Sequence, residues 1–194
     1  MSTKKNLVTF LYKYRVTFGF IYGFMFLVFS KPTSIKFIYI GLTIALFGEF
    51  IRLLSSGYLI KTDRLTTNGP YSFVRHPLYF GSFLMGLGLC VSIFSIQYLT
   101  SSTIFMISFL LLFLSVYIPV LRREESVLIE KYSDLYKQYK NHVPMLLPRL
   151  FPYSSKDNEE VKFDKKVFMR NREYRALLGL LFIIIIIFLK FKFI

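Results

Sequence analysis

One short stretch of the chain, GPYSFVRHPLYFG (residues 69–81), gathers basic and aromatic residues at the start of a long uncharged run. An Asn-Gly-Pro triplet at its beginning predicts a turn, and Pro77 suits the first position of a helix, where a missing N–H group removes no hydrogen bond. His76 is therefore expected at a helix N-terminus, where free backbone N–H groups and the helix dipole favour a carboxylate or phosphate. Tyr79 shares the face of His76. The stretch can bind an anionic group, although an interfacial anchor would have a similar composition.

A second group of ionisable residues lies in RREESVLIEKYSDLYKQYKNHVPMLLP, which begins at Arg122. Helical spacing places Glu124 on one apolar face with the following residues: Leu128, Tyr132, Leu135 and Tyr139. Glu125 is then expected at the edge of this face. A carboxylate among apolar groups needs a cation, which is either a ligand or a structural ion-pair partner such as Arg75 or Arg52. Two prolines beyond residue 142 predict the end of the helix and an extended segment that could cover the site.

The composition indicates whether this chain folds in water or in a membrane. Its 194 residues are 54% hydrophobic and 19% aromatic, with 25 basic against 11 acidic side chains and a net charge of +14. A soluble domain of this size could not hide so much apolar surface, so we predict a membrane protein. The basic residues fall between apolar runs, which is typical of loops facing anionic lipid headgroups and argues against a nucleic-acid partner. The single Cys90 excludes an internal disulfide, and no cluster of metal ligands is evident.

Five apolar runs predict an all-α polytopic membrane bundle in which short connections pair the helices into hairpins. The predicted spans are Val16 to Phe29, Ile35 to Leu54, Leu78 to Leu99, Thr103 to Leu121 and Ala176 to Ile194. A helical extension is expected to follow the fourth span into the cytoplasm. With five spans, one side of the membrane carries 21 of the 25 lysine and arginine residues. The positive-inside rule assigns that side to the cytoplasm, together with the stretch at residues 69–81.

The order and spacing of these motifs resemble those of the isoprenylcysteine carboxyl methyltransferase and phospholipid methyltransferase family. The similarity runs from about residue 60 to residue 150: L-x-x-x-GPY-x-x-VRHP-x-Y-x-G from Leu65, a hydrophobic hairpin, EE-x-x-L-x-x-x-Y-x-x-x-Y, and a VP…LP tail. Members of this family are multi-span membrane enzymes that bind S-adenosylmethionine at the cytoplasmic end of this hairpin. The resemblance implies one membrane methyltransferase domain over residues 1–194, with a charged linker at 151–175 and a C-terminal span at 176–194.

The resemblance also assigns roles to individual residues. The positions that match the cofactor-binding segments are Leu65, Thr66, Tyr71, His76, Pro77, Leu78, Tyr79 and Glu124. Glu124, Arg75 and Arg122 are the expected catalytic residues. The prenylcysteine enzymes carry an arginine four residues before the glutamate, where this chain has Val120. Either Arg122 or Arg123 would have to replace that arginine if the substrate bears a carboxylate.

The implied function is methyl transfer from S-adenosylmethionine to a membrane-borne acceptor, either a lipid headgroup or a prenylated cysteine carboxylate. A sulfonium cation suits a carboxylate and aromatic rings such as those of Glu124, Tyr71 and Tyr79. Neither a metal nor a nucleic acid is expected to take part. Two alternatives remain: a reductase of the membrane sterol-reductase type, which would bind a nicotinamide dinucleotide, and a membrane scaffold without catalytic activity.

Overall fold

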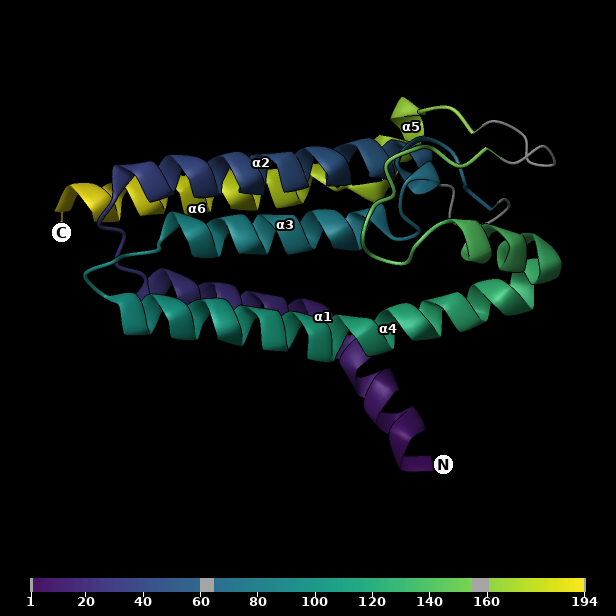
Figure 1. Ribbon diagram of the computed structural model, residues 1–194, viewed down its shortest axis with the longest axis horizontal. Helices are drawn as coiled ribbons and strands as arrows, with labels where there is room; N and C mark the ends of the chain where they lie inside the picture. The colour runs from purple at the N-terminus through teal and green to yellow at the C-terminus, as the bar shows by residue number, and fades with distance from the viewer. Residues whose placement is uncertain (1, 60–64, 155–160, 194) are drawn as a thin grey trace. The chain divides into compact units, whose positions relative to one another are not determined.

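The computed structural model describes residues 2–59, 65–154 and 161–193, and within these ranges the chain is helical and contains no strand (Figure 1). The elements are α1 (Ser2–Phe29), α2 (Ile35–Tyr58), the 3₁₀-helix η1 (Gly69–Ser72), α3 (Pro77–Ser92), α4 (Leu99–His142), α5 (Lys165–Asn171) and α6 (Tyr174–Phe193). The all-α prediction is confirmed. Of the predicted features, Lys61, Arg64, Ile194 and residues 155–160 of the linker lie outside the described residues.

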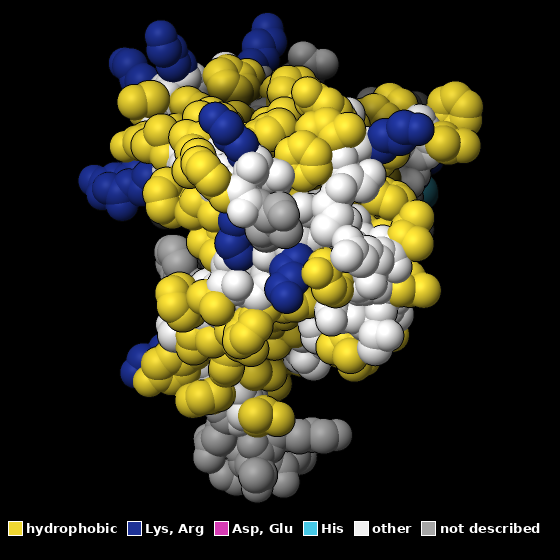
Figure 2. Space-filling model, turned by 90° about the vertical axis from the view of Figure 1, so that its left-hand side faces the viewer, with side chains coloured by type: hydrophobic (Ala, Val, Ile, Leu, Met, Phe, Trp, Pro, Cys, Tyr) yellow, Lys and Arg dark blue, Asp and Glu magenta, His cyan; other side chains and the backbone are white. Residues whose placement is uncertain are grey.

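Three described helices, α2, α4 and α6, are long and apolar enough to cross a membrane. Two shorter apolar helices, Thr17–Phe29 within α1 and Pro77–Ser92, complete the five predicted apolar segments. Large hydrophobic side chains remain exposed along the helices, for example Phe24 at 69% and Phe182 at 61%. Figure 2 shows such side chains over much of one face. An integral membrane protein follows, because only lipid accepts so much apolar surface.

The third predicted span is shorter than expected, because α3 ends at Ser92 and residues 93–98 form the connection to α4. Serine side chains explain the difference. The hydroxyl oxygen of Ser102 accepts a hydrogen bond from the backbone N–H of Ser95 at 3.0 Å, and that of Ser95 accepts one from the N–H of Tyr98 at 3.3 Å. These bonds give the backbone an alternative to the helix, so an apolar sequence leaves the helical conformation early.

Helix α4 has 44 residues, which at ~1.5 Å per residue make it about twice as long as the ~30 Å hydrocarbon layer. Its apolar part ends at Leu121, and the remainder is the helical extension that the sequence predicts. Ser133 interrupts the extension with non-helical dihedral angles (φ 45°, ψ −115°). The helix ends at His142, before Pro144, as the sequence predicts.

The chain folds into two compact units. Unit 1 comprises Met1–Ala45, Gly86–Glu124 and Gly179–Ile194, and unit 2 comprises Leu46–Met85 and Glu125–Leu178. The core of unit 1 is apolar and joins α1, α2, α6 and the end of α3 through Phe26, Ile38, Leu42, Ile93 and Ile187. In unit 2, α5 packs at the end of α2, where the amide of Asn171 donates a hydrogen bond to the carbonyl of Ser56 at 2.8 Å.

Glycine lets α2 and α3 approach closely in both units. In unit 1, a Cβ atom added at Gly88 would lie 2.4 Å from the backbone nitrogen of Ala45 and 2.4 Å from the carbonyl oxygen of Gly41. In unit 2, a Cβ atom at Gly81 would lie 2.5 Å from the carbonyl oxygen of Gly48. Gly81 and Gly88 therefore serve the packing of α3 against α2. Helices in lipid have no hydrophobic driving force for association, so close packing of their backbones stabilises the contact instead.

A lysine side chain caps the end of α1 in unit 1. The ammonium group of Lys190 donates hydrogen bonds to the carbonyl oxygens of Leu27 at 2.5 Å, Val28 at 3.1 Å and Ser30 at 2.9 Å. These carbonyls lie at the helix C-terminus, where backbone acceptors lack helical partners and the dipole favours a cation. The ammonium group of Lys190 therefore links α6 to the end of α1.

Replacement of Gly88 by alanine should destabilise the protein although alanine is the better helix former. The new methyl group meets backbone atoms that cannot rotate away, so we expect a loss of about 1–3 kcal/mol. Gly179→Ala is the matched control, because nothing lies within 4 Å of its added Cβ atom. Thermal unfolding in detergent, followed by circular dichroism, should show a lower midpoint for Gly88→Ala alone. Equal midpoints for both variants would contradict the close packing of α2 and α3.

Candidate active site

The stretch singled out in the sequence forms a well-bonded turn in unit 2. Gly69 adopts a positive φ of 60°, which opens η1, and the hydroxyl of Ser72 donates to the Gly69 carbonyl at 2.7 Å. The segment that follows α4 runs alongside. The N–H of Arg75 donates to the carbonyl of Pro144, and the N–H of Arg149 donates to that of Phe73, both at 2.9 Å. The predicted segment beyond α4 therefore packs directly against this turn.

Arg75 connects the turn to the extension of α4. Its Nε and Nη2 atoms lie 2.7 and 2.6 Å from Oε1 of Glu125. Its Nη1 donates to the carbonyl oxygens of Lys140 at 2.8 Å and Val143 at 2.6 Å. The guanidinium thus binds one buried carboxylate and two carbonyls at the C-terminal end of the helix, a geometry that lysine could not reproduce.

Glu125 is the centre of this ion network. Besides Arg75, its carboxylate meets Nζ of Lys140 at 3.1 Å, and Nε2 of His76 lies 3.5 Å away. Burial by itself would raise the pKa of Glu125, but the nearby side chains of His76 and Lys140 and the charge of Arg75 outweigh burial and lower the pKa to about 2. The carboxylate is therefore ionised throughout the physiological pH range and does not act as a proton acceptor.

The prediction that Glu125 lies at the edge of the apolar face is wrong. Glu125 is buried, with 4% of its surface exposed, whereas Glu124 is half-buried. Beyond Leu121, the buried residues of α4 are Glu125, Tyr136 and Tyr139. Leu135, which the prediction placed on this face, is 43% exposed. The non-helical Ser133 breaks the regular spacing between the two halves of the extension, so one uninterrupted helical pattern misplaces the buried face.

Tyrosine rings surround the ion network. Tyr136, Tyr139 and Val143 form a buried cluster against which Leu65 packs. The hydroxyl of Tyr139 donates to the carbonyl oxygen of Tyr71 at 2.6 Å, which joins α4 to η1. The ring of Tyr79 meets that of His76 edge to face, with centroids 6.0 Å apart.

Two buried polar atoms in this part of unit 2 have no hydrogen-bond partner among the described residues: Nε2 of His76 and the hydroxyl of Tyr136. Burial raises the pKa of Tyr136, so its hydroxyl stays protonated and can donate. Unsatisfied buried polar groups cost free energy, and a ligand that hydrogen-bonds to them removes that cost.

The structure brings most of the predicted cofactor residues into one part of unit 2. Leu65 packs against the Tyr136 and Tyr139 cluster, Tyr71 accepts a hydrogen bond from Tyr139, and His76 contacts Tyr79. Pro77 and Leu78 are the first residues of α3. The hydroxyl of Thr66 donates to the carbonyl of Tyr58 at 3.1 Å. Glu124 and Arg122 belong to unit 1, where Arg122 is exposed. Arg123 lies over the ring of Tyr12, 4.9 Å from its centroid.

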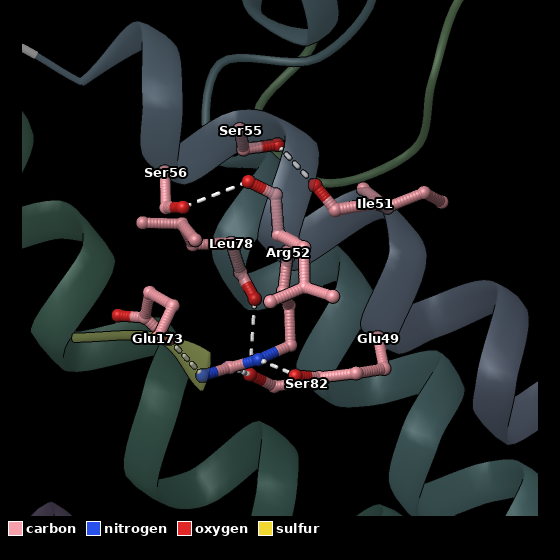
Figure 3. A network of polar contacts seen from close by, with 9 residues as sticks. Glu49, Ile51, Arg52, Ser55, Ser56, Leu78, Ser82 and Glu173 are labelled. Atoms are coloured by element: carbon pink, nitrogen blue, oxygen red, sulfur yellow. Dashed lines mark hydrogen bonds and ion pairs between the residues drawn. The ribbon is translucent and has the colours of Figure 1, made fainter. Parts of the chain in front are cut away.

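A second polar network in unit 2 was not predicted (Figure 3). Arg52 hydrogen-bonds to Ser82 and to Glu173, the latter at 2.5 Å, and its Nε lies 3.2 Å from the buried carboxylate of Glu49. Ser82 in turn donates to the carbonyl of Leu78 at 2.9 Å. The network links α2 and the start of α6 to the first turn of α3. An acid and a base three residues apart near the end of a span are the signal that could have revealed it.

These features define an all-α membrane protein with buried ion networks at the start of an apolar helix. A family model for phospholipid methyltransferases matches residues 34–135, and the chain belongs to that family. The matched range includes Arg75, His76 and Glu125 of the ion network, and Lys140 lies beyond it. No solved structure shows a significant match.

Relatives of known name support the same family. Protein-S-isoprenylcysteine O-methyltransferase of Xenopus laevis is 30% identical over 121 residues, which make up 56% of this chain and 40% of the relative. The enzyme of the same name from Schizosaccharomyces pombe is 32% identical over 88 residues, 45% of this chain and 34% of the relative. The nickel-cobalt-cadmium resistance protein NccN of Alcaligenes xylosoxydans xylosoxydans is 31% identical over 119 residues, which make up 60% of this chain and 50% of the relative. The matched part thus spans half or less of each relative.

Glu125→Gln should destabilise unit 2 strongly. The change leaves the guanidinium of Arg75 and the ammonium of Lys140 without a buried anion, and breaking such a pair costs about 3 kcal/mol. Glu130→Gln, on the exposed side of the same helix, is the matched control and should have little effect. Thermal unfolding of the detergent-solubilised variants measures the difference. If the Glu125→Gln and Glu130→Gln variants unfold at the same temperature, the ion network does not stabilise the protein.

Proposed function

We propose that this protein transfers a methyl group from S-adenosylmethionine to an acceptor held in the membrane, either a lipid headgroup or a prenylated cysteine carboxylate. The observation that carries the proposal is the group of buried polar residues Arg75, His76 and Glu125 at the start of α3, inside the range that matches the phospholipid methyltransferase family. S-adenosylmethionine would supply a methyl group activated by a positively charged sulfur.

The residues present fit such a donor. Nε2 of His76 and the hydroxyl of Tyr136 are buried and make no hydrogen bond to any described residue, and both can hydrogen-bond to a polar ligand. The N-terminal end of α3 at Pro77 favours a carboxylate. The rings of Tyr71 and Tyr79 and the carboxylate of Glu124 are the groups that we assign to the cationic part.

Methyl transfer requires two reactants to be held in line, with water excluded, more than it requires proton transfer by the protein. The chain meets this requirement with a rigid frame. Arg75 and Glu125 hold the turn against α4, and Arg52 with Ser82 holds the first turn of α3. Because the pKa of Glu125 is low and its oxygens are bound by cations, we assign it a positioning role, and keep Glu124 as the carboxylate that meets the donor.

We further propose that the site faces the cytoplasm, because the same side would carry 21 of the 25 basic residues. Donor and acceptor then come from different phases. The donor is dissolved in the cytoplasm, whereas a lipid-bound acceptor enters sideways from the inner leaflet. Val120 stands where the prenylcysteine enzymes carry an arginine, so a carboxylate acceptor would need Arg122 or Arg123 as its cation.

His76→Ala should weaken binding of S-adenosylmethionine and of its demethylated product about tenfold, because one hydrogen bond of ~1–2 kcal/mol is lost. Isothermal calorimetry on the detergent-solubilised chain measures both ligands. His142→Ala, at the chain's other histidine, is exposed and should bind as the wild type does. If His76→Ala binds S-adenosylmethionine as tightly as the wild type, His76 does not bind the methyl donor. Tight binding of a nicotinamide dinucleotide would replace the methyltransferase by a reductase.

Glu124→Gln should reduce turnover by more than about tenfold while the protein still folds, since a carboxylate that stabilises a cation by more than ~1.4 kcal/mol is lost. Transfer of a radiolabelled methyl group to the lipids and prenylated peptides of a membrane extract measures turnover. Glu130→Gln serves again as the control for a charge change on α4. Near-normal turnover of Glu124→Gln would make Glu124 a structural residue.

A further inference from the structure

Unit 1 contains a pocket that the proposed methyl transfer does not use. Its volume is about 340 Å³, and it lies between the end of α1, the 93–98 connection and the start of α4. The lining residues are Phe29, Ser30, Lys31, Ile93, Tyr98, Ser101, Ser102, Ile104 and Phe105. Ser101 precedes Glu125 in α4 by more than the roughly 20 residues that cross the hydrocarbon layer. The pocket is therefore a separate site.

The pocket offers the cation of Lys31 and the hydroxyl of Ser101. Nζ of Lys31 lies 5.0 Å from the centroid of the Tyr98 ring and meets no carboxylate within the part of the chain that the structure describes. The hydroxyl of Ser102 already bonds to Ser95, whereas that of Ser101 makes no hydrogen bond to any described residue. Ser101 also lies in the first turn of α4, where the helix dipole adds positive potential.

The surroundings of the pocket contain positive charge and no negative charge. Residues 27–40, 88–107 and 183–193 include four lysines and neither aspartate nor glutamate. The face in Figure 2 likewise shows lysine and arginine side chains among hydrophobic ones, with no acidic side chain visible. Lys190 is committed to the α1 carbonyls, and Lys36 and Lys192 do not line the pocket. Lys31 is thus the cation left to bind a ligand.

The remaining walls are mostly apolar, and two of their side chains are largely exposed. Phe29 and Ile104, at the ends of apolar helical segments, are 59% and 62% exposed. Lys31 follows the last residue of α1 by two positions, at the level where a membrane helix meets the headgroups. Polar groups at one end and apolar side chains at the other match the two parts of a phospholipid. A volume of 340 Å³ suits a headgroup rather than a whole lipid.

We propose that this pocket binds the phosphate diester of an anionic membrane phospholipid. Lys31 and the hydroxyl of Ser101 contact the phosphate, and the acyl chains lie against Phe29 and Ile104. The anion is favoured over a zwitterionic lipid, because the described residues around the pocket include no carboxylate side chain to accept the positive end of a choline headgroup. The proposal does not rest on methyl transfer.

Native mass spectrometry of the full chain in detergent tests the proposal, with phosphatidylglycerol and phosphatidylcholine as probes. We expect one phosphatidylglycerol to be retained more tightly than phosphatidylcholine. Lys31→Gln should weaken phosphatidylglycerol binding about fivefold, the effect of one basic residue near a charged lipid surface. Lys36→Gln, an exposed lysine outside the pocket, is the matched control and should bind as the wild type does.

Three results would overturn the site. Equal retention of the two lipids would remove the selectivity for an anion. Equal weakening by Lys31→Gln and Lys36→Gln would show general surface attraction instead of a pocket. Complete competition by inorganic phosphate would make free phosphate, and not a lipid, the ligand. Thermal unfolding of Lys31→Gln near the wild-type midpoint shows that any loss of binding is local.

Discussion

The buried guanidinium of Arg75 is the interaction on which the arrangement of unit 2 depends. It binds the carboxylate of Glu125 and two carbonyl oxygens at the C-terminal end of α4, and its own backbone N–H bonds to the segment beyond. One side chain thereby holds a turn, a helix and the chain that follows the helix. Buried charges are costly unless every polar group is bound, so this residue restricts the segment to one conformation.

Two kinds of helix contact occur in the molecule, and they follow from the local solvent. Glycine lets α2 and α3 touch in both units, and in unit 1 an apolar cluster fills the space between helices. In unit 2, ion networks around Arg52 and Arg75 link the same kinds of element. Lipid gives helices little hydrophobic reason to associate, so close backbone packing serves there, whereas charged networks suit the region near water. The chemistry proposed for unit 2 needs this polar, rigid surrounding.

The comparisons place the family in the part of the chain where these networks lie. The match to the phospholipid methyltransferase family ends at residue 135, within the extension of α4. The segment after His142, which bonds to the turn at Arg75, lies beyond it. In unit 2, the residues matched by the family model therefore bond to the C-terminal segment beyond them. Arg52, which is inside the matched range, likewise bonds to Glu173, which is outside it.

Sequence alone determined the features that depend on neighbouring residues. Apolar runs located the helices, the Asn-Gly-Pro triplet located η1, and Pro77 located the start of α3, because solvent and backbone sterics act over a few residues. Only the tertiary structure decided which glutamate is buried, where α3 ends, and which partner Arg52 takes. Glu125 is the buried glutamate because Ser133 departs from the helix and Arg75 meets Glu125 from a distant segment. Such choices depend on contacts between residues far apart in the chain, which no local pattern contains.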